Sequence, residues 1–142
     1  MEGQSSNKRK ATTEPELHTE FNALVVEQNV DVRLAHKELL RLAGIRTCDT
    51  AGNGQEAVNL HLSGKRFDLI LMDMDMPDDD GFVTINKLRS MNVRSLIVSV
   101  SGPCSQDIVQ RLLKEMPIDG HCTKPLTVQM LEVVLHKFGL KP

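Results

Sequence analysis

Four short apolar runs in the sequence each end on side chains that could handle phosphate. A carboxylate can accept a phosphoryl group, and a second acid beside it helps to hold Mg²⁺, a hard cation that takes oxygen ligands. A hydroxyl and an ammonium group supply hydrogen bonds and positive charge to phosphoryl oxygens. If the runs are parallel strands, their carboxyl ends share one edge of a sheet, where ligands bind in open α/β folds. The residues at these ends are Glu27 with Gln28, Asp73, Ser101 and Lys124.

Asp73 follows the most distinctive of these runs. Residues 69–72 are all apolar and are bounded by turn residues, which is typical of a strand buried on both faces. A carboxylate-rich loop around Pro77 and Gly81 follows at once. Asp73 is therefore expected at the carboxyl end of a central strand, as a candidate for phosphoryl or metal chemistry. The alternative is that Asp73 only caps the following turn, as aspartates often do.

Strand and helix signals alternate along the rest of the chain. Strands are expected at residues 23–26, 45–50, 69–73, 96–100 and 121–123, each followed by a helix. Asn29 suits the start of the first helix and Gly44 its end. Ser105 suits the start of the fourth helix, which stops before Pro117 because proline cannot donate to the helix ladder. Five βα units in a row predict a flavodoxin-like fold, a three-layer α/β/α sandwich around a doubly wound five-stranded parallel sheet.

Helical spacing of apolar residues predicts which sides of the helices face the sheet. In each helix the inward residues recur every three or four positions. The predicted inward residues are Ala35, Leu39 and Leu42 in the first helix, Ala57, Val58 and Leu62 in the second, and Leu131, Val134, Leu135 and Phe138 in the last.

The length of 142 residues fits one domain with a single core. Residues 20–142 are expected to form this domain. Residues 1–19 are polar and are expected to be a disordered arm. Within that arm, the basic cluster at residues 7–10 is either a nuclear import signal or part of a solvated tail.

Composition also excludes several classes of protein. A net charge of −2 argues against a polyanion-binding protein, and the lack of Trp and Tyr leaves little for stacking on nucleic-acid bases. No apolar segment is long enough to span a membrane, and no signal-peptide core follows Met1. The three scattered cysteines are most simply reduced thiols. A protein of the cytosol, the nucleus or both is expected.

As a set, the motifs resemble those of response-regulator receiver domains. Ser101 lies 28 residues beyond Asp73, and Lys124 lies 51 residues beyond it, as in that family. The family pattern MPxxDG occurs at residues 76–81, and the pairs Ser101-Gly102 and Lys124-Pro125 also match. The resemblance covers about residues 20–140. The segments NGQEAVNLH, FDLILMD and KPL are most similar to those of the stand-alone type C response regulators of plants.

This resemblance implies a role in a His-to-Asp phosphorelay, the two-component signalling used for example in plant cytokinin responses. Asp73 would be the phosphoacceptor and would take its phosphoryl group from a histidine-phosphotransfer protein. Glu27, Asp73 and the backbone carbonyl of Asp75 would be ligands of Mg²⁺, with Gln28 as a weak further ligand. Apart from self-phosphorylation and self-dephosphorylation, no enzyme activity is implied.

The resemblance also implies a switch. Ser101 would be the hydroxyl that bonds the phosphoryl group, and Lys124 would pair with that group and form a cis peptide bond to Pro125. His121 lies where the family has an aromatic switch residue. The face formed by the fourth helix, the fifth strand and the last helix would change on phosphorylation and could bind a downstream protein.

Two positions depart from the family pattern. The family usually ends its first strand on two acids, but the second here is Gln28, which offers an oxygen without a charge. A weakened Mg²⁺ site follows from this. The second departure is Pro117, which stands where a glycine commonly ends the fourth helix, and proline cannot form the left-handed cap that glycine provides.

Only 18 residues follow Lys124, so no DNA-reading module is expected after the last helix. The favoured function is a phosphoryl sink or a protein-binding switch. One alternative is a pseudo-receiver that binds partners without phosphorylation, which Gln28 favours. A remoter alternative is a haloacid dehalogenase-like phosphatase, since Asp73-Met74-Asp75 resembles that nucleophile motif, although only Glu132 follows Lys124 as an acid.

Overall fold

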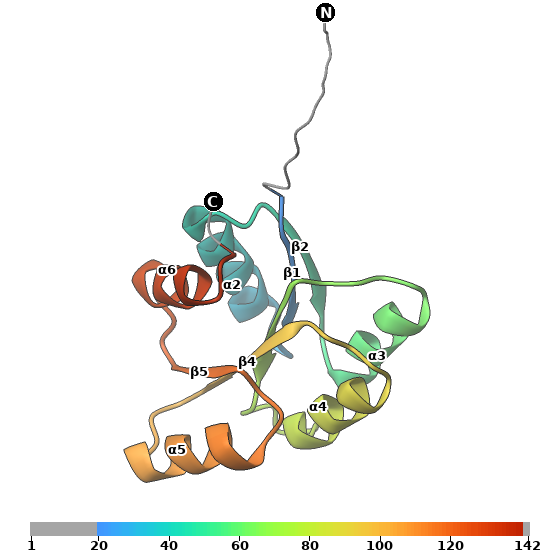
Figure 1. The fold of residues 1–142 in the computed structure, drawn as a ribbon. Helices are drawn as coiled ribbons and strands as arrows, with labels where there is room; N and C mark the ends of the chain where they lie inside the picture. Colours follow the sequence, from blue (N-terminus) through green and yellow to red (C-terminus); the bar gives the residue numbers. More distant parts are fainter. Residues whose placement is uncertain (1–19, 141–142) are drawn as a thin grey trace, which may run out of the picture.

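The computed structural model describes residues 20–140, and over this range strands and helices alternate five times (Figure 1). The predicted arm at residues 1–19 and the last two residues lie outside the described range. The elements are β1 (Asn22–Val26), α2 (Val30–Ala43), β2 (Thr47–Ala51), α3 (Gly54–Leu62), β3 (Leu69–Asp73), α4 (Gly81–Ser90), β4 (Leu96–Ser101), α5 (Gln106–Glu115), β5 (Gly120–Thr123) and α6 (Val128–Lys137).

All five strands are parallel and lie in the order β2-β1-β3-β4-β5. The chain reverses direction across the sheet after β2, so the crevice of a doubly wound sheet lies beyond the carboxyl ends of β1 and β3. The predicted flavodoxin-like sandwich is confirmed. None of the helices within residues 20–140 is long and apolar enough to cross a membrane.

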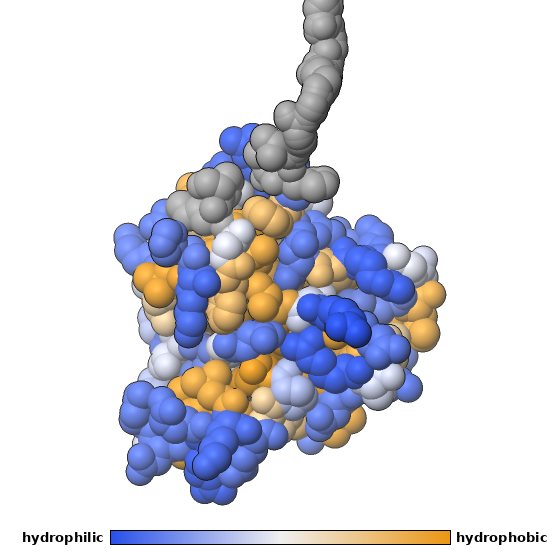
Figure 2. Space-filling view, in the orientation of Figure 1, coloured by the Kyte–Doolittle hydropathy of each residue, from blue (hydrophilic) through white to orange (hydrophobic). Residues whose placement is uncertain are grey.

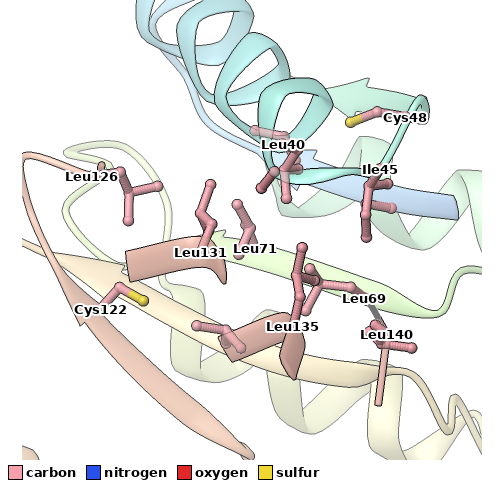
Figure 3. Packing of buried hydrophobic residues seen from close by; sticks show 14 of the residues in the cluster. Leu40, Ile45, Cys48, Leu69, Leu71, Cys122, Leu126, Leu131, Leu135 and Leu140 are labelled. Atoms are coloured by element: carbon pink, nitrogen blue, oxygen red, sulfur yellow. The ribbon is translucent and has the colours of Figure 1, made fainter. Parts of the chain in front are cut away.

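β3 is the central strand, and all five of its residues are buried. Successive side chains of a strand point to opposite faces of the sheet. Leu69 and Leu71 accordingly lie in the core under α2 and α6, which Figure 3 shows, whereas Ile70 and Met72 lie in the core under α3, α4 and α5. The uninterrupted apolar run before Asp73 is therefore the consequence of helices on both faces.

Each helix begins at a side chain that accepts a hydrogen bond from a free backbone N–H group of the first turn. Because each helix follows a strand, these helix N-termini lie along the carboxyl edge of the sheet, where their partial positive charge favours anions. The capping residues are Asn29, Asn53, Asp80, Ser105 and Thr127.

The helix ends follow the sequence signals. Gly44 closes α2 in the left-handed conformation with φ of 118°, which glycine adopts at little cost. α5 ends at Glu115, and Met116 before Pro117 has an extended backbone with φ of −105° and ψ of 148°. Extended backbone is what a residue before proline prefers. The prediction that Pro117 ends this helix without a left-handed cap is confirmed.

The predicted inward face of α2 was wrong in part. The buried residues are His36, Leu40 and Ala43, whereas Ala35 is exposed and Leu42 is 54% exposed. Apolar residues occur on several sides of this helix, so the spacing alone did not single out one stripe. The stripe that is buried is the one that packs against β1 and α6.

The predicted face of α3 needs a similar correction. Ala57 and Val58 are buried as predicted, but Leu62 is 69% exposed and His61 is buried in its place. The ring of His61 packs edge-on against Phe67, with 5.3 Å between ring centroids. Its Nδ1 also lies 2.8 Å from the carbonyl oxygen of Ala57, whereas its buried Nε2 has no hydrogen-bond partner among the described residues.

The corrected face of α2 predicts a contrast between two neighbouring leucines. Leu40→Ala should lower the free energy of unfolding by about 2–5 kcal/mol, because it removes a fully buried side chain and leaves a cavity. Leu42→Ala should change it by less than about 0.5 kcal/mol. Guanidinium unfolding followed by circular dichroism measures both, since the chain has no Trp. Equal losses would contradict the assigned face.

Candidate functional site

A crevice of about 420 Å³ opens at the carboxyl edge of the sheet, at the reversal point between β1 and β3. Its lining comes from the ends of β1 and β3, from the first turn of α2 and from the loop after β5. The structure therefore brings together residues that lie far apart in the sequence. The lining residues are Glu27, Gln28, Asn29, Val32, Asp73, Asp75, Met76, Pro77 and Lys124.

Asp73 lies at the base of this crevice and is 4% exposed. Its Oδ1 accepts a hydrogen bond from the backbone N–H of Asp75 at 3.0 Å and another from Lys124 Nζ at 2.8 Å. A buried carboxylate needs such partners because its charge has lost its water. Asp73 therefore both caps the turn that follows β3, as the alternative expected, and pairs with Lys124.

Lys124 is the common cation of the crevice. Its Nζ lies 2.8 Å from Asp73 Oδ1, 3.6 Å from Asp75 Oδ2 and 3.8 Å from Glu27 Oε1. Burial works against the charged ammonium, but the Asp73 carboxylate, together with Glu27 and Asp75, outweighs it and raises the pKa of Lys124. The side chain therefore stays positively charged at neutral pH. The bond from Lys124 to Pro125 is cis, as the resemblance implied.

Glu27 is also 4% exposed, but its carboxylate is only partly satisfied. Oε2 accepts a hydrogen bond from the backbone N–H of Asn29 at 2.9 Å, whereas Oε1 is buried and has no hydrogen-bond partner among the described residues. Burial raises the pKa of Glu27, and the nearby Asp73 carboxylate adds to this, against the Asn29 N–H and Lys124. A buried oxygen without a hydrogen-bond partner is unfavourable, and a divalent cation bound between it and a neighbouring carboxylate would satisfy it.

Gln28 lines the same crevice from an exposed position. Its Nε2 donates to Asp78 Oδ2 at 3.4 Å, a long contact. The Oδ2 of Asp75 accepts a hydrogen bond from Gly102 N–H at 2.7 Å. Within residues 20–140 no cluster of three or more His, Cys, Asp or Glu side chains is arranged to hold a metal. Of the three carboxylates that line the crevice, Glu27 and Asp73 are buried, whereas Asp75 is half exposed.

Ser101 ends β4 beside this crevice and takes part in a chain of polar contacts. Its Oγ lies 3.2 Å from His121 Nε2 and donates to the carbonyl oxygen of Gly102 at 3.3 Å. The other ring nitrogen of His121, Nδ1, lies 2.7 Å from Ser99 Oγ. Both nitrogens of the ring are therefore held by serine hydroxyls of β4.

Sequence reasoning missed two members of this arrangement, Ser99 and the side chain of Asp75. A signal for Ser99 was present, since residues two apart on a strand share a face and Ser101 had been singled out. The pairing of Ser99 with His121 in the register of β4 and β5 brings the two together. No comparable signal pointed to the contact between Asp75 and Gly102, because it joins two loops.

Fold and crevice together define a domain of the CheY-like type, and comparison with known proteins agrees. The family model for the response regulator receiver domain matches residues 23–136, and the chain belongs to this family. The fold is similar to that of chemotaxis protein CheY4 of Vibrio cholerae, with a TM-score of 0.72 and 25% identity, covering 83% of this chain and 98% of that one.

The similar curated proteins include stand-alone plant regulators. Two-component response regulator ARR22 of Arabidopsis thaliana is 38% identical over 120 residues, which covers 83% of this chain and 84% of that protein. Two-component response regulator 24 of the same plant is 36% identical over 121 residues, covering 85% and 86%. Two-component response regulator ORR41 of Oryza sativa is 32% identical over 118 residues, covering 82% and 92%. The predicted family is therefore confirmed.

The environment of His121 makes a prediction about pH. Burial lowers the pKa of this ring below the ordinary histidine value of about 6.5, in spite of the opposing charge of Asp75. Between the folded and the unfolded pKa the folded chain binds fewer protons, so the free energy of unfolding should fall as the pH drops below about 6.5. His121→Gln should lose this part of the acid sensitivity.

Two measurements check this prediction. NMR titration of the His121 imidazole should give a midpoint below about 6.5, and unfolding experiments at about pH 7.5 and about pH 5.5 should show a smaller difference for His121→Gln than for the wild type. A midpoint above the ordinary value would mean that the two serines favour the charged ring more than burial disfavours it.

Proposed function

We propose that this chain accepts a phosphoryl group on Asp73 from a histidine-phosphotransfer protein, as a step of a His-to-Asp phosphorelay. The observation that carries the proposal is the buried pair of Asp73 and Lys124 at 2.8 Å, at the reversal point of the sheet. Membership of the receiver family and similarity to plant two-component regulators support it. Of the three described acids near Lys124, Asp73 is the one that ends a strand and accepts a hydrogen bond from the ammonium, whereas Glu27 and Asp75 lie 3.8 Å and 3.6 Å from it.

In the proposed transfer, a carboxylate oxygen of Asp73 attacks the phosphorus atom of a phosphohistidine, and the bond from phosphorus to the histidine nitrogen breaks. The ammonium of Lys124 then moves from the carboxylate to the phosphoryl oxygens, where negative charge accumulates. Ser101 turns its hydroxyl toward the same oxygens. These residues act by position and charge, which is how proteins handle phosphoryl transfer in general.

Receiver domains normally bind Mg²⁺, which neutralises charge on the phosphoryl oxygens and on the acids around them. In this chain Glu27, Asp73, the backbone carbonyl of Asp75 and, weakly, Gln28 would hold it. The Oε1 atom of Glu27 supports this assignment, because no described residue donates a hydrogen bond to it and the nearest ammonium, Lys124 Nζ, lies 3.8 Å away. The missing second acid at Gln28 argues for a weak site.

The output would pass through His121. When Ser101 turns toward the phosphoryl group, the ring loses the partner of its Nε2 and can change position, which is a shift between two populated states. The surface formed by α5, β5 and α6 would change when the His121 ring moves. α5 has no fully buried residue, and Figure 2 shows hydrophobic surface (orange) between the α5 and α6 regions, so a downstream protein could bind there.

We favour a phosphoryl sink over a protein-binding switch, because draining phosphate needs no further partner. A pseudo-receiver that binds partners without being phosphorylated is the second candidate, and the observation that favours it is the uncharged Gln28 at the crevice. The phosphatase alternative has no support from the family match. The proposal keeps the expectations of a cytosolic or nuclear location and of no direct contact with nucleic acid.

The proposal is tested with a histidine-phosphotransfer protein that carries labelled phosphate. Substoichiometric wild-type chain should release several equivalents of inorganic phosphate from the donor, whereas Asp73→Asn should release none, because the accepting oxygen is lost. Asp31→Asn, which removes an exposed acid of α2, is the control. Label on the Asp73→Asn chain at the wild-type level would contradict the assignment, and an intact donor would favour the pseudo-receiver.

A second prediction concerns the metal. Gln28→Asp should lower the Mg²⁺ concentration needed for half-maximal phosphorylation by roughly fivefold or more, because two unit charges at 4 Å attract by about 1 kcal/mol in a water-like dielectric and Mg²⁺ carries two. Gln110→Asp on α5 adds the same charge far from the crevice and should leave the requirement unchanged. NMR shifts at residues of the crevice during a Mg²⁺ titration give the affinity without phosphorylation. An unchanged requirement in Gln28→Asp would place Gln28 outside the metal site.

A further inference from the structure

The side chain of Asp75 bridges two loops across the mouth of the crevice. Its Oδ2 accepts a hydrogen bond from the backbone N–H of Gly102 at 2.7 Å and lies 3.6 Å from Lys124 Nζ. Asp75 belongs to the loop after β3, and Gly102 directly follows Ser101 in the loop after β4. A carboxylate therefore occupies two donors that both lie beside Asp73.

Those donors are the kind that a phosphoryl group on Asp73 needs. An ammonium group and a backbone N–H both bind phosphoryl oxygens well. In the structure each nearby donor is already engaged, since Gly102 N–H bonds Asp75, Lys124 is shared between Asp73 and Asp75, and Ser101 contacts His121. Asp75 also brings a negative charge to the place where a doubly charged phosphoryl group must enter.

We infer that the Asp75 carboxylate is an internal competitor of the phosphoryl group, which must leave Gly102 N–H and Lys124 before Asp73 can be phosphorylated. This inference rests on the proposed function and adds a residue that sets its rate. The competitor can move, because the Asp75 side chain is 47% exposed and can turn into solvent without disturbing the core. Asp75 is thus a positioning residue, not a catalytic one.

A simple structural role for the same contact makes the opposite prediction. If the hydrogen bond from Gly102 only ties the two loops together, its loss should loosen the crevice and slow phosphorylation. If Asp75 competes with the phosphoryl group, its loss should speed phosphorylation. Side-chain substitutions separate the two, because they leave in place the backbone N–H of Asp75 that bonds Asp73 and the backbone carbonyl assigned to the metal.

The experiment compares Asp75→Asn and Asp75→Ala with the wild type in the full chain. The initial rate of Asp73 labelling by acetyl phosphate, followed by intact mass at fixed Mg²⁺, should rise roughly fivefold or more in Asp75→Ala and less in Asp75→Asn, whose amide oxygen can still accept from Gly102. Asp31→Asn removes one exposed charge next to Val32, which lines the crevice, but none of these contacts, and should change the rate by less than twofold, about the limit set by screened charge alone.

A second measurement needs neither metal nor phosphate. In the wild type the amide proton of Gly102 should resonate downfield, because it bonds a carboxylate, and in Asp75→Ala it should move upfield and exchange faster with solvent. Labelling of Asp75→Ala where the wild type is not labelled would support the competitor strongly. Equal or slower labelling in Asp75→Ala, or an equal gain in Asp31→Asn, would overturn the inference while leaving the proposed function intact. No labelling of any chain by acetyl phosphate would also overturn the inference, whereas the proposed function is overturned only if the histidine-phosphotransfer protein keeps its label too.

Discussion

The contact between Asp73 and Lys124 is the interaction on which the rest of the site depends. A carboxylate that is 4% exposed at the end of the central strand is unfavourable alone, and the ammonium at 2.8 Å offsets its loss of water. The same contact joins the end of β3 to the segment after β5, which the sheet order separates by β4. Any group that binds at Asp73 must therefore bind at Lys124 as well.

The crevice holds more negative than positive charge. Lys124 is the ammonium shared by Glu27, Asp73 and Asp75, and the raised pKa of Glu27 reflects burial together with this crowding. A divalent cation would reduce the excess of negative charge by adding positive charge near Glu27. A phosphoryl group would increase that excess, and it would draw the Lys124 ammonium away from the carboxylates. Gln28, which is uncharged, adds nothing to this crowding.

The polar contacts of β4 connect this chemistry to the surface. The hydroxyls of Ser99 and Ser101 each contact one ring nitrogen of His121, which belongs to the neighbouring strand β5. The ring is thus coupled to the hydroxyl at the crevice on one side and to the interior of the sheet on the other. α5, which lies beside β5 and has no fully buried residue, is the element with the least packing to resist a change there.

The sequence by itself determined the alternation of strands and helices, the starts of the helices and the residues at the strand ends, whereas the order of the strands in the sheet came from the structure. These features depend on local chemistry, such as the capping side chains and Pro117, and on topology rules for βα units. Only the tertiary structure decided which stripe of α2 is buried, why His61 replaces Leu62 in the core, and which atoms Asp75 and Ser99 contact. These contacts join residues that are far apart in the sequence. They depend on the register of neighbouring strands and on which loops lie side by side, and neither can be read from the local sequence.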